Sequence, residues 1–475
     1  MSDTGESSKA VVVLGVGPIP PENPPRLHAP GLRLWTLARF LAGRGHDVAV
    51  AMVGFGGGQP ESGPPGQQED DALSAPLLPH GIKCYHLPYN IALAAKNVRR
   101  IAEQHRARCV VSTTDFMNLV AATARVAVPL WLDFMGQPMA ERQLLADVCG
   151  SDEGLLGQWE YVVPSLLAGD RFSVCSERQR YMMLGELGAV GRLNRHTVNV
   201  NLVETLVPFH LFDEKIAHTR TVLRGSLVGA NDFVVLWSGG YNTWADVETL
   251  FRGIEYAMAR ERRMVFVSTG GAIPGHDERT FEHFRRLVET SANRDRYKLC
   301  GWVPTDDVQN YYLESNVAVN VDRWTVEGLV GYRTRILDWI MAGLPVVTTA
   351  LSELVEELAS RGFVTTFRIG DPDDLGEKLL ALARDCSEAS ERTAKARDYL
   401  QTRLDPAVAL APLAAWVESP QPAPDLPAPH ERPNLPFVCP QNSLAQLHCA
   451  ALRSHTTGSA TAPAKKRWWE RLLGC

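Results

Sequence analysis

The sequence has no apolar run long enough to cross a membrane, and its first apolar stretch, Ala10 to Val16, is also too short for the core of a signal peptide. Nine cysteines are present, but no two of them form a Cys-x-x-Cys pair, the spacing typical of zinc and redox sites. We therefore expect a cytoplasmic protein with reduced thiols, without a disulfide framework and without a bound metal.

A strongly basic domain is also missing. The 48 lysines and arginines are outnumbered by 54 aspartates and glutamates, which gives a net charge of -6 and a pI near 6.1. Because nucleic-acid binding needs clustered cations that neutralise phosphates, this balance argues against a nucleic-acid partner. The composition, 45% hydrophobic and 21% charged, is that of a globular protein, and 475 residues are enough for two domains.

A dinucleotide-binding fingerprint is incomplete. Gly15-x-Gly17 follows a short buried strand, but no third glycine stands at the required place, which disfavours an NAD site. The same region does contain a strand from Ala10, a glycine-bounded helix over 31–45 and a second strand over 46–53. This order of elements predicts a right-handed crossover in a parallel sheet.

The alternation of strands and helices continues and then starts again in the second half of the chain. Further strands are expected over 82–88, 109–115, 129–135, 197–209, 233–240, 263–271, 297–304 and 317–322, with a helix over 92–106 and another that Ser176 caps. The pattern predicts an α/β protein with two doubly wound parallel sheets, whose ligands gather at the carboxyl ends of the strands. Asp115 and Asp133 lie at two such ends.

Composition and pattern divide the chain into ranges. We expect a disordered start at 1–9, an N-terminal domain at 10–205, a second domain at 206–405, a returning helix at 406–417, and a Pro-rich linker with a basic aromatic tail at 418–475. Residues 55–80, rich in Gly, Pro and Gln, predict a surface insertion. The tail places cations beside Trp468 and Trp469, so it is either plainly disordered or a segment for peripheral contact with the inner face of a membrane.

The most informative stretch runs from Glu327 to Thr348. Apolar residues at three-and-four spacing predict a helix after a glycine loop, and Gly343 with Pro345 ends this helix before a buried strand. Arg333, Arg335 and Asp338 fall near the start of the helix, where the backbone dipole favours an anion. The alternative is a surface ion pair on a core helix.

This stretch resembles the nucleotide-sugar signature of the retaining GT-B glycosyltransferases of family 4, in which an acidic residue, a glycine loop and a helix are followed by Ala-Gly-x-Pro-Val-Val. The run Arg-Thr-Arg before Asp338 is similar to one branch of that family. The resemblance implies that Glu327 faces the donor sugar as a catalytic residue and that Asp338 binds the ribose hydroxyls. The family usually leaves seven residues between two glutamates, whereas here ten residues separate Glu327 from Asp338.

The resemblance also implies how the donor diphosphate is bound. Gly239, Gly240 and Trp244 stand where the family has a glycine loop with an arginine and a lysine for the diphosphate, and this loop contains neither cation. Backbone amides at a helix start and Arg333 or Arg335 would then have to meet the diphosphate charge.

The remaining implied positions concern the nucleotide base and the acceptor. Gly301 and Val303 look like the place where the main chain of the family binds the base. Gly31 and Arg33 resemble the acceptor side of the first crossover, and the alternative for Arg33 is a solvated helix arginine. Asp133 is similar in position to a polar residue that faces the reacting sugar, where many relatives carry histidine, and a plain strand-end cap is the alternative.

Together the resemblance implies a GT-B fold, with two Rossmann-like domains facing across a cleft. The implied activity is transfer of a sugar, with retention and without a cofactor or metal, from a nucleotide-diphosphate sugar to a polysaccharide, O-antigen or lipid-linked glycan. Two alternatives stay open: an epimerase or hydrolase of the same fold, and a catalytically silent nucleotide-sugar-binding module. The sequence does not specify the sugar, the base or the acceptor.

Overall fold

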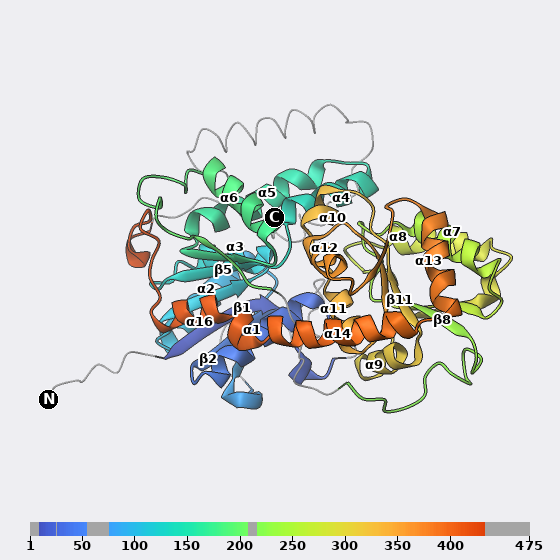
Figure 1. Cartoon of the computed structure of the whole chain (residues 1–475). Helices are drawn as coiled ribbons and strands as arrows, with labels where there is room; N and C mark the ends of the chain where they lie inside the picture. The colour runs from blue at the N-terminus through green and yellow to red at the C-terminus, as the bar shows by residue number, and fades with distance from the viewer. Residues whose placement is uncertain (1–8, 25, 55–75, 208–215, 433–475) are drawn as a thin grey trace, which may run out of the picture. The chain divides into compact units, whose positions relative to one another are not determined.

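A computed structural model describes residues 9–24, 26–54, 76–207 and 216–432. It contains two compact units, each built on its own parallel sheet (Figure 1): unit 1 comprises Met1–Val207 together with Ala409–Cys475, and unit 2 comprises Pro208–Val408. The predicted α/β class with two doubly wound sheets is therefore confirmed. The expected disordered start, most of the 55–80 insertion and the basic aromatic tail lie outside the described residues.

Unit 1 contains a seven-stranded parallel sheet in the order β3-β2-β1-β4-β5-β6-β7. Its strands are β1 Ala10–Val16, β2 Asp47–Val53, β3 Lys83–His86, β4 Cys109–Thr113, β5 Leu130–Phe134, β6 Arg171–Val174 and β7 Val203–Thr205. Its helices are α1 Ala29–Gly43, α2 Ile91–Gln104, α3 Asp115–Ala124, α4 Pro138–Cys149, α5 Glu153–Ala168, α6 Glu177–Ala189 and α16 Ala411–Glu418, with short 3-10 turns η1 Pro20–Glu22, η4 Pro79–Gly81 and η6 Pro429–Glu431.

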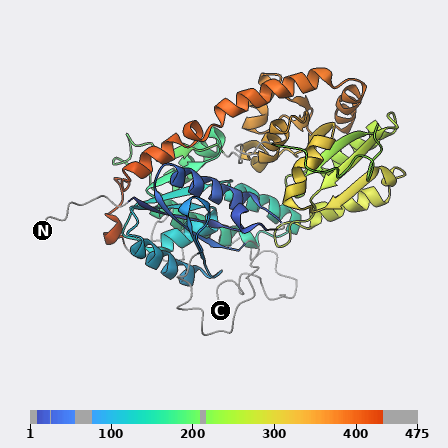
Figure 2. The same ribbon diagram turned by 90° about the horizontal axis from the view of Figure 1, so that it is seen from below.

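Alternate residues of β1 pack against opposite layers of helices. Val12 and Leu14 join the apolar core that the sheet forms with α2, α3 and α5. Gly15 points to the other face, where Leu34 of α1 leaves no room for a side chain. Helices thus cover both faces of the sheet (Figures 1 and 2), as a buried parallel sheet requires.

Unit 2 contains a six-stranded parallel sheet in the order β10-β9-β8-β11-β12-β13. Its strands are β8 Phe233–Ser238, β9 Met264–Thr269, β10 Tyr297–Gly301, β11 Val317–Asn320, β12 Val346–Thr349 and β13 Thr365–Phe367. Its helices are α7 Val247–Met258, α8 Arg279–Glu289, α9 Thr305–Glu314, α10 Val326–Val330, α11 Thr334–Met341, α12 Glu353–Ser360, α13 Pro372–Arg384 and α14 Ser387–Arg403, with the turn η5 Arg294–Arg296; α15 Pro406–Ala409 spans the boundary to unit 1.

The two faces of β8 are also covered by different helices. Trp237 packs in the core that includes residues of α7, α8 and α13. On the opposite face the hydroxyl of Ser238 accepts a hydrogen bond of 2.9 Å from the indole of Trp339 on α11. The strand order reverses between β8 and β11, as it does between β1 and β4 in unit 1, and ligands of such sheets bind beside this reversal at the carboxyl ends.

The local predictions are mostly confirmed, with two corrections. Ser176 caps α6 by accepting a hydrogen bond from the amide of Gln179, and Gly343 ends α11 in the left-handed conformation. The glycine loop expected before α11 is wrong in part, because Thr325 caps the short helix α10 there. Of the strand expected over 197–209, the described residues 197–207 form a strand only at β7.

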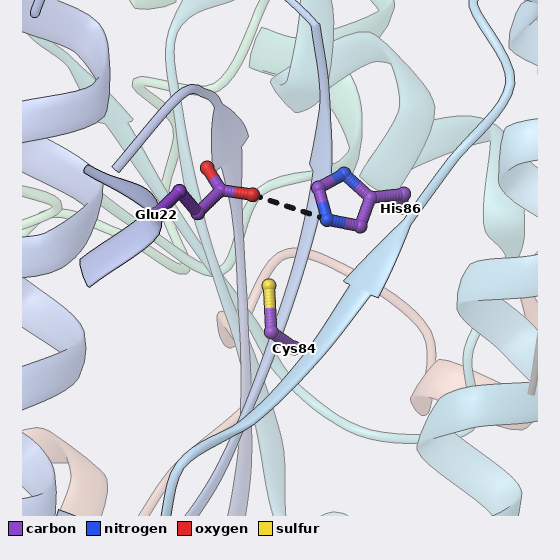
Figure 3. Close-up of side chains that lie close together, drawn as sticks. All are labelled: Glu22, Cys84 and His86. Carbon is purple, nitrogen blue, oxygen red and sulfur yellow. Dashed lines mark ion pairs between the residues drawn. The ribbon is translucent and has the colours of Figure 1, made fainter. Parts of the chain in front are cut away.

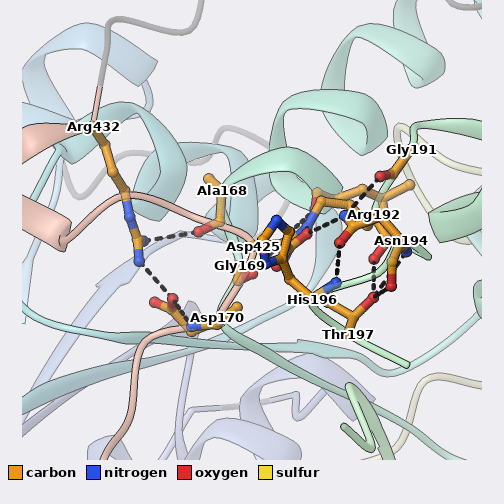
Figure 4. Close-up of polar contacts among 12 residues, drawn as sticks. Ala168, Gly169, Asp170, Gly191, Arg192, Asn194, His196, Thr197, Asp425 and Arg432 are labelled. Carbon is orange, nitrogen blue, oxygen red and sulfur yellow. Dashed lines mark hydrogen bonds and ion pairs between the residues drawn. The ribbon is translucent and has the colours of Figure 1, made fainter. Parts of the chain in front are cut away.

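A third difference concerns the Pro-rich segment after α16. The sequence predicts a Pro-rich linker here, but residues 420–432, here named the C-terminal segment, pack against the rest of unit 1 (Figure 4). Arg192 donates to Asp425 over 2.6 and 3.1 Å, and Arg432 donates to Asp170 over 2.5 Å. Buried charge pairing holds this segment, which apolar patterning could not predict.

Within the described residues, no helix is both long enough and apolar enough for a bilayer crossing.

Candidate functional site

The candidate site of unit 2 lies at the carboxyl ends of β8, β9, β10 and β11. The amide of Gly239, after β8, donates to the carbonyl of Thr269 over 2.7 Å. The amide of Gly270, after β9, donates to the carbonyl of Gly301 over 2.6 Å. The main chains of three neighbouring strand ends are therefore joined directly, beside the reversal in strand order.

Gly270 allows this close approach. Its φ of 110° lies in the range that residues with side chains rarely adopt, and a Cβ at this position would collide with the carbonyl of Gly239. Gly239 has a φ of 90°, so the turn after β8 also depends on glycine. The prediction that Gly239 and Gly240 form a glycine loop is consistent with this geometry, while their role in binding a diphosphate stays a prediction.

Arg335 reaches this loop from the first turn of α11. Its Nη2 donates to the carbonyl of Gly240 over 3.0 Å, and its guanidinium carbon lies 4.9 Å from the ring centre of Trp237. Its Nη1 is buried without a hydrogen-bond partner, and among the described residues no carboxylate lies within ion-pair distance of Arg335. Burial lowers the pKa of Arg335, an effect that the charge of Asp322 partly offsets. Within the part of the chain that is described, Arg335 therefore has the more distant charge of Asp322 but no carboxylate in direct contact.

Arg333 has the opposite surroundings. Its Nη1 and Nη2 donate to both oxygens of Glu327 over 2.8 and 2.7 Å, and its Nε donates to Asp322 over 3.0 Å. Residues Arg333, Glu327 and Asp322 are 4%, 3% and 1% exposed, respectively, and the guanidinium of Arg333 lies over the ring of Trp244 at 4.8 Å. Burial alone would lower the pKa of Arg333, but the attraction of Asp322 and Glu327 outweighs it and raises the pKa.

This network bears on three predicted site residues. The structure brings Glu327, Arg333 and Trp244 together, as the sequence predicts for members of one site. It pairs Glu327 with Arg333 in a closed bidentate contact, so the positive charge predicted for a diphosphate is already compensated by two carboxylates. The catalytic role of Glu327 and the diphosphate role of Arg333 stay predictions.

Asp338 lies one turn after Arg335 on the same helix, partly buried. The pKa of Tyr312 on α9 is raised mainly by burial and to a smaller extent by the negative charge of Asp338. The hydroxyl of Tyr312 accepts a hydrogen bond from Ser238 at the end of β8. Asp338 is thus placed near the carboxyl end of β8, where the predicted ribose contact would require it.

Gly301 and Val303 lie at and just after the end of β10. Gly301 has a φ of 67°, and its carbonyl is the acceptor for Gly270. Trp302, between them, donates from its indole nitrogen to the carbonyl of Ala272 over 2.9 Å. Both predicted residues therefore belong to the same edge of the sheet as Gly239, and contact with a base stays a prediction.

In unit 1 the structure brings Arg33 and Asp133 together. Arg33 of α1 donates to both carboxylate oxygens of Asp133 over 3.0 and 2.8 Å and to the carbonyl of Leu206 over 3.2 Å. Ser173 also donates to Asp133 over 2.6 Å. Burial by itself lowers the pKa of Arg33, and the charge of Asp133 reverses this and raises it.

Asp133 is fully buried, and the side chain of Arg33 is 2% exposed. A solvated helix arginine, one alternative for Arg33, is therefore wrong. Gly31 precedes Arg33 on α1, and a Cβ at Gly31 would collide with the carbonyl of Pro18, so close packing requires glycine at this position. Contact of Gly31, Arg33 or Asp133 with an acceptor stays a prediction.

Three residues of these clusters were not singled out from the sequence. Asp322 follows β11 at a strand end, which is a recognisable signal, but its partner Arg333 is on another element. Gly270 stands in a Thr-Gly-Gly run that marks a turn without showing what approaches it. Ser173 alternates along β6 like any strand residue, and no pattern distinguishes it.

A protein-family model matches part of unit 2, whereas solved structures match most of the chain. Residues 232–385 match the family model described as "Glycosyl transferases group 1". No curated protein matches the sequence.

Solved structures match most of the chain at low identity. A sucrose-phosphate synthase from Thermosynechococcus elongatus has a TM-score of 0.65 and 15% identity, covering 86% of this chain and 98% of its own. A UDP-forming trehalose-phosphate synthase from Burkholderia vietnamiensis has a TM-score of 0.62 and 14% identity, covering 87% and 99%. The Anabaena protein HepE in complex with UDP-glucose has a TM-score of 0.59 and 14% identity, covering 86% and 99%.

Identities this low show the fold alone, so the matched family model supplies the evidence on activity. The chain therefore has the GT-B fold of the glycosyltransferases, and its residues 232–385 are similar to the group 1 glycosyl transferases.

Proposed function

We propose that this protein is a glycosyltransferase that moves a sugar from a nucleotide-diphosphate donor to a polysaccharide or lipid-linked glycan, with retention and without a metal in the transfer step. It acts in the cytoplasm or at the inner face of the membrane. The matched family model and the Anabaena neighbour with UDP-glucose support a nucleotide-sugar donor.

Arg335 is the observation that carries the proposal. Arg335 is partly buried, and its buried Nη1 has no hydrogen-bond partner and no carboxylate within ion-pair distance among the described residues, so an anion would offset the cost of burying this charge. It lies at the first turn of α11 beside the Gly239-Gly240 turn, where helix dipole and main-chain amides also favour negative charge. A diphosphate supplies such an anion in the ground state and gains negative charge as it leaves.

The other residues take supporting roles in this mechanism. Asp338 accepts hydrogen bonds from the ribose hydroxyls. Arg333 holds Glu327 by two hydrogen bonds and fixes its orientation beside the sugar position. The acceptor attacks from the face that the diphosphate leaves, and the leaving phosphate takes the acceptor proton, so no side-chain nucleophile is needed.

The closed contact of Glu327 with Arg333 favours a second candidate function, a module that binds a nucleotide sugar without turnover. Arg333 already binds both carboxylate oxygens of Glu327, and its charge is compensated by Glu327 and Asp322. Slow hydrolysis of the donor in the absence of acceptor separates the two functions. A transferase releases nucleotide diphosphate over hours, whereas a silent module binds the donor and leaves it intact.

The first test is a thermal-shift screen of the full chain against nucleotide-diphosphate sugars, followed by calorimetry with the best ligand. A donor at a hundred times its dissociation constant adds about 2.7 kcal/mol to the free energy of unfolding. Arg335→Met should weaken donor binding by about tenfold or more, because a charge-assisted hydrogen bond contributes roughly 1.5 to 3 kcal/mol. Arg286→Met, at an exposed arginine of α8, is the matched control.

Two results would contradict the proposal. One is the absence of any stabilising nucleotide sugar in the screen. The other is equal donor affinity in Arg335→Met and Arg286→Met with both variants folded, which would remove Arg335 from the site.

A further inference from the structure

A cysteine, a histidine and a glutamate meet at the edge of the unit 1 sheet. Cys84 and His86 are two apart on the edge strand β3, so their side chains point to the same face. Glu22 is the last residue of η1, on the connection from β1 to α1. Figure 3 shows the thiol, the imidazole and the carboxylate converging, and their donor atoms all lie within 4.8 Å of one another.

The backbone holds the carboxylate in place. One oxygen of Glu22 accepts a hydrogen bond of 2.9 Å from the amide of Ile19, a residue with no exposed surface. The other oxygen lies 3.1 Å from Nε2 of His86. The backbone of η1 therefore orients the side chain of Glu22, and its second oxygen faces His86 on β3.

The sheet fixes the other two side chains. Cys84 pairs with Val50 and His86 with Met52 in the parallel register of β3 and β2. Cys84 is 1% exposed, while the side chains of His86 and Glu22 are 51% and 23% exposed. The sulfur thus lies at the closed end of the cluster, and solvent and small ions reach it from the imidazole side.

We propose that Glu22, Cys84 and His86 bind one divalent metal ion of the zinc class. Thiolate sulfur, imidazole nitrogen and carboxylate oxygen are the donor types that zinc prefers. Bonds of about 2.0 to 2.3 Å at tetrahedral angles put donor atoms about 3.3 to 3.8 Å apart, so the present separations close with small side-chain movements. Three protein ligands leave a fourth position for water.

Without a metal, the three groups form a hydrogen-bonded cluster. Nε2 of His86 lies 3.1 Å from the Glu22 carboxylate, and the Cys84 thiol lies beside both groups. A metal ion takes the place of any proton on the imidazole donor nitrogen and of the thiol proton, since both ligands bind metals in their deprotonated forms. The released protons pass to the buffer.

The metal fixes the connection between β1 and α1. Glu22 lies on this Pro-rich connection, which leads directly to Gly31 and Arg33, and the ion would tie it to the edge strand. This metal site does not depend on the proposed activity, because the proposed binding site for the nucleotide sugar lies in unit 2. The lack of paired cysteines predicts that no metal is bound, whereas these three ligands come from a strand and from a turn distant in the sequence.

The test uses the full chain after treatment with a chelator. Calorimetry with zinc chloride should give one high-affinity ion per chain, and cobalt chloride should give a thiolate-to-cobalt charge-transfer absorption. Cys84→Ser and His86→Gln should each weaken zinc binding by about tenfold or more and abolish this absorption. Cys149→Ser, at an exposed cysteine on α4, is the control and should bind zinc as the wild type does.

Each other outcome overturns the inference. These outcomes are no stoichiometric binding, a cobalt spectrum without the thiolate band, or equal zinc affinity in Cys84→Ser and Cys149→Ser. If Cys84→Ser does not fold, His86→Gln and Glu22→Gln decide, because their side chains are partly exposed. The affinity for the nucleotide-sugar donor should be the same with and without zinc. A negative result for zinc binding would therefore leave the proposed glycosyltransferase function untouched.

Discussion

Arg333 and Arg335 stand two positions apart, and their surroundings make them chemically different. Arg333 is held by two carboxylates and its charge is more than compensated, whereas Arg335 contacts a carbonyl and an aromatic face. A helix start turns adjacent side chains in different directions, so the sequence Arg-Thr-Arg does not show which cation is paired. The resemblance implies that Arg333 or Arg335 meets the diphosphate charge, and the geometry favours Arg335.

The proposed role of Asp338 gives a prediction at the residue scale. Asp338→Ala should weaken nucleotide binding by roughly 1.5 to 3 kcal/mol, the range for losing a charge-assisted hydrogen bond. Calorimetry with a nucleoside diphosphate measures this, and Asp295→Ala, at a 98% exposed side chain, should leave affinity unchanged. Wild-type affinity in a folded Asp338→Ala protein would show that this carboxylate does not contact the nucleotide.

Glu186 provides a pH-dependent prediction. Burial raises its pKa to about 7, although it accepts a hydrogen bond from Gln137. Because the folded state keeps this proton between about pH 4.5 and 7 while the unfolded state loses it, the free energy of unfolding falls as pH rises through this window.

Replacing the carboxyl with an amide removes this dependence. Glu186→Gln should raise the free energy of unfolding by roughly 2 to 3 kcal/mol above pH 7 and leave it nearly unchanged at pH 4. Denaturant unfolding of both proteins at pH 4, 5.5 and 8 checks this. A gain of equal size at all three pH values would contradict titration of Glu186 as the cause.

At the scale of elements, the strand ends of unit 2 depend on one glycine. Gly270→Ala should displace the Gly239 turn, because the added methyl group meets the Gly239 carbonyl rather than a movable side chain. We expect loss of stability and about tenfold or greater loss of nucleotide affinity, from strain of roughly 1 to 3 kcal/mol.

Gly275→Ala is the matched control for Gly270. Gly275 also has positive φ, but open space surrounds its Cβ position. Unfolding and calorimetry of both variants separate backbone strain from collision with the turn. Similar nucleotide affinity in the two variants would mean that the Gly239 turn tolerates displacement.

The predictable elements are those with strong local signals. The helix expected over 92–106 and the structured α2 agree closely, since apolar spacing and the Asn90 cap define it locally. The short helix α10 was missed because Gly328 and Gly331 suggest a loop, while tertiary contacts decide the outcome: a Cβ on Gly328 would collide with Leu351. The Glu327–Arg333 and Glu22–His86 contacts join separate elements, and no periodicity shows such pairs.

At the scale of the whole molecule, the C-terminal segment contributes to the stability of unit 1. Asp425→Asn should lower the free energy of unfolding of unit 1 by about 3 kcal/mol, because it leaves the buried guanidinium of Arg192 without its counter-charge. Hydrogen exchange should increase in peptides of unit 1 and stay unchanged in unit 2. Asp152→Asn, at an exposed position before α5, is the control.

Equal exchange in both variants would show that Arg192 keeps adequate partners without Asp425. Two such partners are already present, the carbonyls of Leu166 and Gly169 at 2.6 and 3.0 Å. They accept hydrogen bonds but carry no charge, which is why the expected loss is large.

The discontinuous make-up of unit 1 has a consequence for biosynthesis. Unit 2 is inserted between two parts of unit 1, so a ribosome completes residues 208–408 before it reaches α16 and Asp425. During that interval Arg192 and Asp170 in the nascent N-terminal region lack their ion partners Asp425 and Arg432. The seven-stranded sheet of unit 1 also still lacks helix α16. The order of synthesis therefore differs from the order of folding. Unit 2 can fold as soon as it is synthesised, whereas unit 1, whose sheet is synthesised first, completes its fold last.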